Sequence, residues 1–398
     1  MKSLEFNMPT IIKAGNGEFL HTGAYMKQFI GGERILIITD PGIEKAGFTG
    51  KVKELLEQEG YITETFNRVS PNPRDLDCKA GGEAARNFGA DAILALGGGS
   101  VIDSAKAIAI LHCLGGEPRD YAGRNNVPEK VTPIAVIPTT AGTGAEVTRS
   151  SVITDTAKKI KFTIKDVHIA PVLAIVDPEL TYNLPAHLTA STGMDALVHA
   201  VEAYTCRLAN PISDALATQA MKYIYPYLRR AFNDGSDIEA RYHLMIGSTI
   251  AGMAFSHADV ASVHCMAEAI GGLYDTPHGM ANSMFLPYIV EFNAGADIEK
   301  HAEIARVMGI ASPNEPDRSA AALLVAEMKK LAADLAIPAF STLPDVCEED
   351  FDYLAEAAFK NNSTPSNARE IGKDDYFMLF KRAFMGADSA AGIEGTSK

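Results

Sequence analysis

Two polar side chains on one predicted helix are spaced so that they can share a cation. Asp195 and His199 lie four residues apart in the stretch 191–205, which is rich in Ala, Leu and Met and contains no proline. On an α-helix this spacing places a carboxylate and an imidazole one turn apart on the same face. The pair by itself is also consistent with an ordinary hydrogen bond on a helix surface, so further ligands are needed to indicate a metal site.

Two histidines further along the chain supply those ligands. His264 lies on a second apolar helix, and His278 follows a Gly-Gly break and a Thr-Pro pair that begins another helix. One carboxylate and three imidazoles suit a single divalent transition metal with nitrogen and oxygen ligands. We therefore predict that Asp195, His199, His264 and His278 hold one metal ion, without any thiolate.

A run of glycines could hold a phosphate. Gly97, Gly98, Gly99 and Ser100 lie between a predicted strand and a predicted helix. Glycines let the backbone approach a pyrophosphate, and the N-terminus of the following helix favours negative charge. The run lacks the spacing of the usual dinucleotide fingerprint, and a triple glycine after a strand is also consistent with a tight turn.

A second loop, of hydroxyls and glycines, contains Thr139, Thr140 and Thr143 and also follows a predicted strand. Its side chains can bind phosphate, ribose or carboxamide groups. Thr143 and Glu146 also match a helix capping box, and both interpretations can hold at once.

Asp40 ends the predicted strand 34–39. An acidic side chain at this place can accept hydrogen bonds from an adenosine ribose and repels a 2′-phosphate. The alternative is a turn-starting aspartate before Pro41 and Gly42.

Taken together, these segments resemble the iron-containing (group III) metal-dependent alcohol dehydrogenase family. The resemblance extends over roughly residues 5 to 385. The matching motifs, in the order of the family, are 97–103, 138–148, 193–204, 251–256 and 277–282.

The resemblance implies an NAD(P)-dependent alcohol dehydrogenase that interconverts a small primary alcohol or diol and its aldehyde. It implies Fe²⁺ as the metal, with Zn²⁺ or Mn²⁺ as alternatives. Members with Asp at position 40 tend to use NAD, and those with Gly tend to use NADP. The family also implies that Asp103 reaches the cofactor, that Lys161 lies near its ribose and that Phe255 lines the pocket. Without the family, Asp103 is a dipole partner in the first turn of its helix and Lys161 is a solvated residue of a hairpin at 156–165.

Two positions near the expected pocket depart from the family. Glu268 stands where a histidine is usual, and His257 lies in an altered segment. These two residues, together with the pocket-lining Phe255, are our candidate catalytic residues. Glu268 lies one helical turn beyond His264 and has three interpretations: a proton acceptor, an additional oxygen ligand, or a structural carboxylate paired with a neighbour such as His257. We favour the first or the third, because four ligands already suffice for the metal.

Composition limits the partners. The 398 residues carry a formal net charge of −14, with no basic patch, which argues against nucleic acid or an anionic membrane as a partner. The five cysteines are scattered and odd in number, as expected of a protein from a reducing cytoplasm. We find no long apolar run and no signal peptide.

The family implies a homodimer or a larger assembly, and the alternating apolar residues of 3–14 could pair with an edge strand.

The hydrophobic pattern predicts two domains. Up to residue 184, apolar strands alternate with helices, which indicates a Rossmann-like α/β domain with a parallel sheet covered on both faces. From 185 to 398 the pattern is helical throughout and predicts an all-α, metal-binding domain, with the active site in the cleft between the two. The predicted strands are 34–39, 61–67, 92–96, 134–137 and 172–176. The predicted helices are 43–59, 74–88, 101–111, 186–208, 212–233, 236–254, 259–271, 277–292, 297–308, 317–335, 348–360 and 373–385.

Other functions on the same scaffold remain as alternatives. A maleylacetate-type reductase works without metal, which the complete Asp/His set argues against. A carbon–oxygen lyase of the dehydroquinate synthase type needs a basic pocket, and residues 250–280 contain no such lysine and arginine set. A non-catalytic nucleotide-binding or assembly protein would not need both phosphate loops and four ligands.

Overall fold

The structure, a computed structural model, describes residues 4–386. Its N-terminal half contains a six-stranded sheet in the order β1-β9-β6-β4-β2-β3, with every pairing parallel. The strands are β1 (Ile11–Ala14), β2 (Arg34–Ile38), β3 (Ile62–Phe66), β4 (Ala92–Gly97), β6 (Ile134–Pro138) and β9 (Leu173–Val176).

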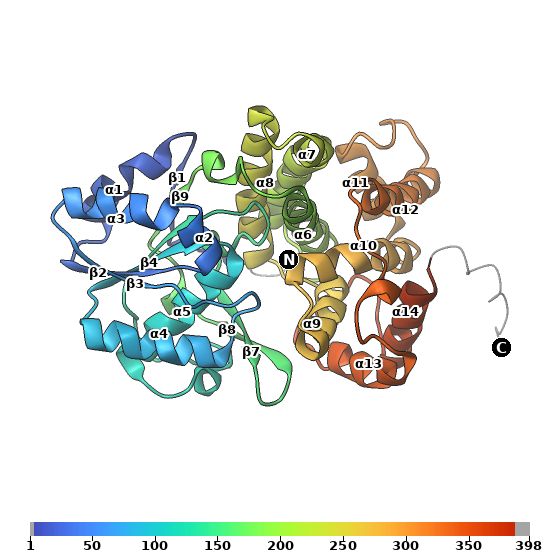
Figure 1. Cartoon of the computed structure of the whole chain (residues 1–398). Helices are drawn as coiled ribbons and strands as arrows, with labels where there is room; N and C mark the ends of the chain where they lie inside the picture. Colours follow the sequence, from blue (N-terminus) through green and yellow to red (C-terminus); the bar gives the residue numbers. More distant parts are fainter. Residues whose placement is uncertain (1–3, 387–398) are drawn as a thin grey trace.

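Helices cover both faces of this sheet, which is why its central strands are apolar throughout. In β2, Ile35 and Ile37 pack with α1 and α3, whereas Leu36 and Ile38 pack with α4 and α5 on the other face (Figure 1). The helices of this half are α1 (Thr22–Phe29), α2 (Pro41–Lys45), α3 (Phe48–Gln58), α4 (Asp75–Phe88) and α5 (Gly99–Leu114).

A small second sheet extends from the first half towards the helical half. Its hairpin consists of β7 (Ser150–Asp155) and β8 (Ile160–Lys165), which pair antiparallel, and β5 (Gly123–Arg124) adds to β8. The hairpin predicted at 156–165 therefore begins earlier, at Ser150. In Figure 1 it lies beside α9.

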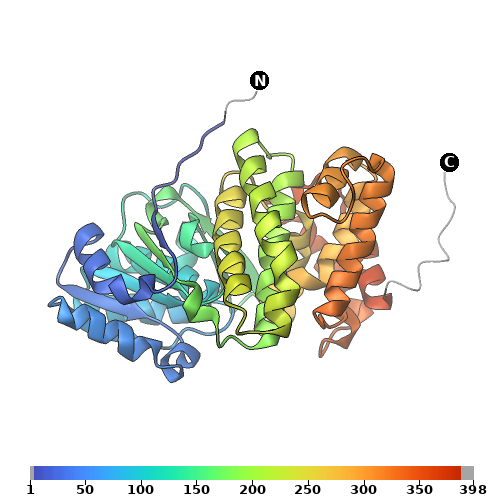
Figure 2. The same ribbon diagram turned by 90° about the horizontal axis from the view of Figure 1, so that it is seen from above.

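From residue 186 to 386 the chain contains helices and loops but no strand, as the sequence predicts. Figures 1 and 2 show these helices packed as one body beside the sheet half, and one apolar core runs through both halves. The helices are α6 (Ala186–Thr205), α7 (Pro211–Asn233), α8 (Ile238–Ser256), α9 (Ser262–Tyr274), α10 (His278–Ala294), α11 (Ile298–Val307), α12 (Asp317–Asp334), α13 (Phe351–Phe359) and α14 (Lys373–Met385).

Two helices and the N-terminal segment also differ from the sequence prediction. The single helix predicted over 43–59 is two helices, α2 and α3, because Gly47 between them adopts a left-handed conformation with φ of 86°. The helix predicted at 348–360 begins as a short 3₁₀ turn before α13. In the N-terminal segment, residues 11–14 form β1 and pair with β9 at the edge of their own sheet. Among residues 4–386, no helix is long and apolar enough to span a bilayer.

Candidate active site

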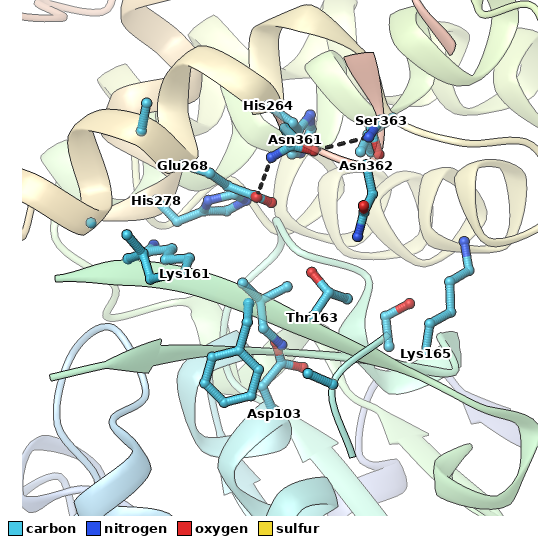
Figure 3. Close-up of a pocket in the computed structure, with 18 of the residues that line it drawn as sticks. Asp103, Lys161, Thr163, Lys165, His264, Glu268, His278, Asn361, Asn362 and Ser363 are labelled. Carbon is cyan, nitrogen blue, oxygen red and sulfur yellow. Dashed lines mark hydrogen bonds between the residues drawn. The ribbon is translucent and has the colours of Figure 1, made fainter. Parts of the chain in front are cut away.

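A cavity of about 540 Å³ lies between the two halves. On one side it is lined by the loop that begins α5 and by the β7–β8 hairpin. On the other side it is lined by α8, α9, the start of α10 and residues 353–363. Figure 3 shows this cavity with Lys161, Thr163 and Lys165 of β8 along one wall.

The four predicted metal ligands converge at this cavity. Asp195 and His199 lie one turn apart on α6, His264 on α9, and His278 is the first residue of α10. One ligand atom from each lies within 4.8 Å of those from the other three. Nε2 of His199 is 3.0 Å from Nε2 of His264. Three of the side chains are buried and His278 is partly exposed, so the cluster is nearly closed to solvent.

Two residues hold the ligands in place. Glu202 accepts a 2.6 Å hydrogen bond from Nδ1 of His264, and the same carboxylate accepts the backbone N–H groups of Ala261 and Val263. Asn282 donates from Nδ2 to Oδ1 of Asp195 at 2.6 Å. Supporting groups of this kind fix the orientation of a ligand and, for a histidine, which nitrogen is free to bind.

The electrostatics of the cluster suit a cation. Burial lowers the pKa of His199 to about 4 and that of His278 to about 3, so both rings are neutral near neutral pH, as metal ligands must be. Burial works to raise the pKa of Asp195, but the three histidines and Asn282 outweigh it and lower that pKa. The result is a buried carboxylate beside His199 and His278, whose neutral rings can each offer a lone pair. We conclude that these residues fit a divalent ion.

The two predicted cofactor loops are in contact. Gly97 to Ser100 follow β4 and begin α5, and the threonine loop follows the neighbouring strand β6. A side chain at Gly99 would place its Cβ 2.4 Å from Cγ2 of Thr143, which explains the glycine there. Both loops lie at the carboxyl ends of adjacent parallel strands, the usual place for a dinucleotide in such sheets. Of these loop residues, Gly99, Ser100 and Thr143 line the cavity.

The capping box predicted for this loop is not formed. Oγ1 of Thr143 accepts from the backbone N–H of Ala145, but Glu146 turns away and accepts from Thr249 instead. Thr139 is buried beneath the loop, and the Thr140 side chain lies against Gly98. Thr143 therefore keeps only part of the structural role that the sequence suggested.

Asp103 and Lys161 both line the cavity. Asp103 accepts from the backbone N–H of Val152 at 2.9 Å, so it ties α5 to the hairpin. Burial raises its pKa, although Lys106, 3.5 Å away, opposes the rise. Lys161 donates from Nζ to Oδ1 of Asn72 at 3.1 Å and packs against Gly271 of α9, on the side of the cavity where His278 and Glu268 lie (Figure 3).

Asp40 lies at the carboxyl end of β2 but does not line the cavity. Its Oδ1 accepts from the backbone N–H groups of Gly42 and Ile43 and so caps α2. The turn role predicted for Asp40 is therefore present. Its other carboxylate oxygen, Oδ2, has no hydrogen bond to any residue between 4 and 386 and remains open to a ligand.

The candidate catalytic residues separate into two groups. Phe255 and Glu268 line the cavity, and the Phe255 ring stacks on His199 with centroids 4.3 Å apart. Glu268 is not part of the four-residue cluster, and its Oε2 accepts from Asn361 at 2.7 Å.

His257 does not lie in the cavity, contrary to our expectation. Its ring stacks on Phe6 and bonds to the backbone of Asn7, so it secures the N-terminal segment to the end of α8. The pairing of Glu268 with His257 that the sequence suggested is also absent, because Asn361 occupies that role. α8 ends at Ser256, two residues beyond its predicted end, and His257 is the C-cap, from which its ring packs on Phe6.

Sequence reasoning missed the supporting residues. Glu202 lies three residues after His199 and Asn282 four residues after His278, both within motifs that we matched. Helical spacing from a predicted ligand was the available signal. Asn72 and Asn361 had no such signal, because each comes from a loop far from the ligands in sequence.

Comparison with known proteins matches both halves of the chain to one family. Residues 9–178 match the family model for iron-containing alcohol dehydrogenase, and residues 189–384 match the model for its C-terminal part. The 1,3-propanediol dehydrogenase of Citrobacter freundii is 40% identical over 90% of this chain and 93% of its own. The NAD-dependent methanol dehydrogenase of Bacillus methanolicus is 38% identical over 95% of this chain and 99% of its own.

A solved structure of 1,3-propanediol oxidoreductase superposes with a TM-score of 0.92 at 38% identity, and covers 96% of this chain and 100% of that one. Fold and comparisons together define a metal-dependent oxidoreductase acting on CH–OH groups. More closely, the chain belongs to the iron-containing alcohol dehydrogenase family and is an alcohol dehydrogenase of that family.

Proposed function

We propose that this dehydrogenase interconverts a small primary alcohol or diol and its aldehyde, with NAD as hydride carrier and Fe²⁺ as the metal. Zn²⁺ and Mn²⁺ suit the same ligands. The observation that supports this best is the convergence of Asp195, His199, His264 and His278 at one end of a cavity that also reaches the glycine loop. Reacting carbon and nicotinamide can therefore meet beside the metal.

Each group of residues has its own task. The four ligands hold the ion, which when bound supplies a Lewis acid for the alcohol or carbonyl oxygen. The loops at 97–100 and 139–143, with Asp103 and Lys161, bind the cofactor. Phe255, stacked on His199, excludes water from the reacting carbon. Glu268 accepts the proton that leaves when the alcohol is oxidised.

NAD is favoured over NADP because of Asp40. Its capping oxygen is occupied, but the other oxygen can accept from a ribose hydroxyl and would repel a 2′-phosphate. We further propose a homodimer, or an assembly of dimers, located in the cytoplasm. All five cysteines lack a disulfide partner, as expected for a reducing compartment.

The test is absorbance at 340 nm with Fe²⁺-loaded protein, NAD or NADP and a panel of short alcohols and diols, together with metal analysis of protein purified without added metal. We expect turnover with NAD and about one bound ion per chain. Turnover that is unaffected by complete metal removal would favour the metal-free reductase chemistry of the same scaffold. No NAD reduction with any alcohol, and none in the reverse direction with aldehydes, would refute the proposal.

A further inference from the structure

A charged cluster lies along the cavity from the metal ligands. It consists of Arg124 of β5, Lys165 at the end of β8, and Asp259 in the loop between α8 and α9, all three of which line the cavity. Residues 161, 163 and 165 share one face of β8, so Lys165 lies ~13 Å along the strand from Lys161. Figure 3 shows Lys161 beside His278 and Lys165 on the opposite side.

The carboxylate of Asp259 is already fully used. It is buried and accepts from the hydroxyls of Ser366 at 2.8 Å and Ser363 at 3.4 Å. It also accepts from Nη2 of Arg124 at 3.4 Å and from the backbone N–H of Val260 at 3.1 Å. Its charge and lone pairs are therefore committed to groups other than a ligand.

Lys165, in contrast, lacks a close partner. Its Nζ lies 4.0 Å from Oδ1 of Asp259, beyond hydrogen-bond distance, and the ammonium has no hydrogen bond to any residue that the structure describes. Yet only 14% of its side chain is exposed. Burial lowers the pKa of Lys165, and Arg124 and Arg149 lower it further against the opposing effect of Asp259.

This end of the cavity is short of one negative charge, because Arg124 and Lys165 both lie close to a single carboxylate, that of Asp259. A largely buried ammonium that has only a distant carboxylate and no hydrogen bond is incompletely compensated, and a bound anion would supply the missing contact. Asn362 lines the same cavity, and its side chain reaches into it (Figure 3). The basic residues come from strands of the first half, which is why residues 250–280 gave no sign of them.

We propose that the physiological substrate is a short alcohol or aldehyde that carries an oxyanion, a carboxylate or a sulfonate, at the end remote from the reacting carbon, and that Lys165 binds this oxyanion. The proposal rests on the proposed function and names the substrate class of the same site. A cationic alcohol of similar length would meet the excess positive charge. A neutral diol would leave the Lys165 ammonium without its partner.

The experiment compares matched pairs of substrates with NAD and Fe²⁺-loaded enzyme. The pairs are 1,3-propanediol and 3-hydroxypropanoate, 1,4-butanediol and 4-hydroxybutanoate, and 1,5-pentanediol and 5-hydroxypentanoate, with 3-hydroxypropanesulfonate to distinguish sulfonate from carboxylate. We expect kcat/KM for one anionic member to exceed that of its diol at least about tenfold, as for a charge-assisted contact in a shielded site. In Lys165→Met we expect this acid-to-diol ratio to fall by about 10- to 100-fold, mainly through KM.

Lys360→Met is the matched control. Lys360 also borders the cavity, but it is 73% exposed and paired with Glu356 at 2.9 Å, so its loss should leave the ratio unchanged. A measurement on the wild type needs no variant: butanoate should raise Tm and inhibit diol oxidation competitively, whereas butan-1-amine should do neither.

The outcomes are distinct. Preference for the diol at every chain length, with no Tm shift from butanoate, overturns the proposal even though diol turnover upholds the alcohol dehydrogenase assignment. An equal fall in the ratio for Lys165→Met and Lys360→Met also overturns it. If no alcohol is oxidised, the proposed function fails instead, and the butanoate Tm shift, lost in Lys165→Met, still decides whether an anion binds at Lys165.

Discussion

Glu202 accepts a hydrogen bond from Nδ1 of His264 at 2.6 Å and thereby leaves Nε2 of that ring facing the other candidate ligands. A carboxylate behind a ligating imidazole fixes its tautomer and increases its basicity. Burial lowers the pKa of His264, yet the charge and hydrogen bond of Glu202 raise it above the ordinary value. The quality of the metal site therefore depends on a residue that does not touch the metal.

Glu202→Gln should weaken Fe²⁺ or Zn²⁺ affinity about 10- to 100-fold, a typical result of losing such a partner. The neutral amide lacks the charge of the carboxylate and has only one oxygen to accept the three hydrogen bonds that Glu202 accepts. Competition with a chelator of known affinity measures the change. Glu239→Gln, which removes an exposed carboxylate paired with Arg230, is the control and should leave affinity unaltered. Equal affinities in the two variants would show that Glu202 only supports the fold.

His264→Ala should abolish tight metal binding and nearly all activity, because the three remaining ligands no longer surround the ion. NAD should still bind, since the cofactor loops belong to the other half of the molecule. Metal analysis and a fluorescence titration with NADH measure the two effects separately. Full metal occupancy together with normal turnover would end the assignment of the four ligands.

Asp40→Gly should shift preference from NAD towards NADP. A carboxylate facing a 2′-phosphate costs on the order of 1–3 kcal/mol, or roughly 5- to 150-fold in selectivity. Because Asp40 also caps α2, Asp40→Ser is the better matched variant: it removes the charge and keeps a capping oxygen. The measurement is the ratio of kcat/KM with the two cofactors. A higher kcat/KM of the wild-type enzyme with NADP than with NAD would show that Asp40 only caps the turn.

Glu268→Gln should keep the metal and the cofactor but lower turnover by about 10- to 100-fold and alter the pH profile, the usual size for one acid–base group. Asn361→Ala removes the hydrogen bond to Glu268 but not its charge, so it should have a smaller effect. Metal analysis, together with kcat measured as a function of pH, distinguishes the possible roles of Glu268. Loss of metal in Glu268→Gln would indicate a ligand, and an unchanged rate and profile would indicate a structural carboxylate.

Lys106→Met should lower the free energy of unfolding by about 3–5 kcal/mol, as when one partner of a buried pair is removed. Lys106 is fully buried and donates to Ala145, Thr148 and Ser150 beside Asp103. Urea unfolding measures the loss. Adding Asp103→Asn should recover part of it, because the uncompensated carboxylate is then gone. No recovery would assign the effect to the backbone contacts alone.

The convergence of the four candidate ligands could be predicted because helical spacing and flanking turns carry the information in short segments, as Asp195 and His199 show. Asp40 stayed ambiguous because a carboxylate before Pro-Gly caps a helix whether or not a ribose lies nearby. His257 could not be placed from sequence, because its partners Phe6 and Asn7 come from the other end of the chain. The grouping of Arg124, Lys165 and Asp259 had no sequence signal, since pairing of β5 with β8 and the placing of a distant loop bring them together.

The hairpin fits against α9 without spare room. A Cβ at Gly272 would lie 2.9 Å from the carbonyl oxygen of Lys159, and one at Gly271 would lie 3.0 Å from Nζ of Lys161. Chimaeras that join the first half of this enzyme to the helical half of a relative at the connection between β9 and α6 would separate two surfaces shaped for each other. Such recombinants should keep the β7–β8 hairpin and α9 from the same parent, although the whole of 166–261 separates the two in the chain.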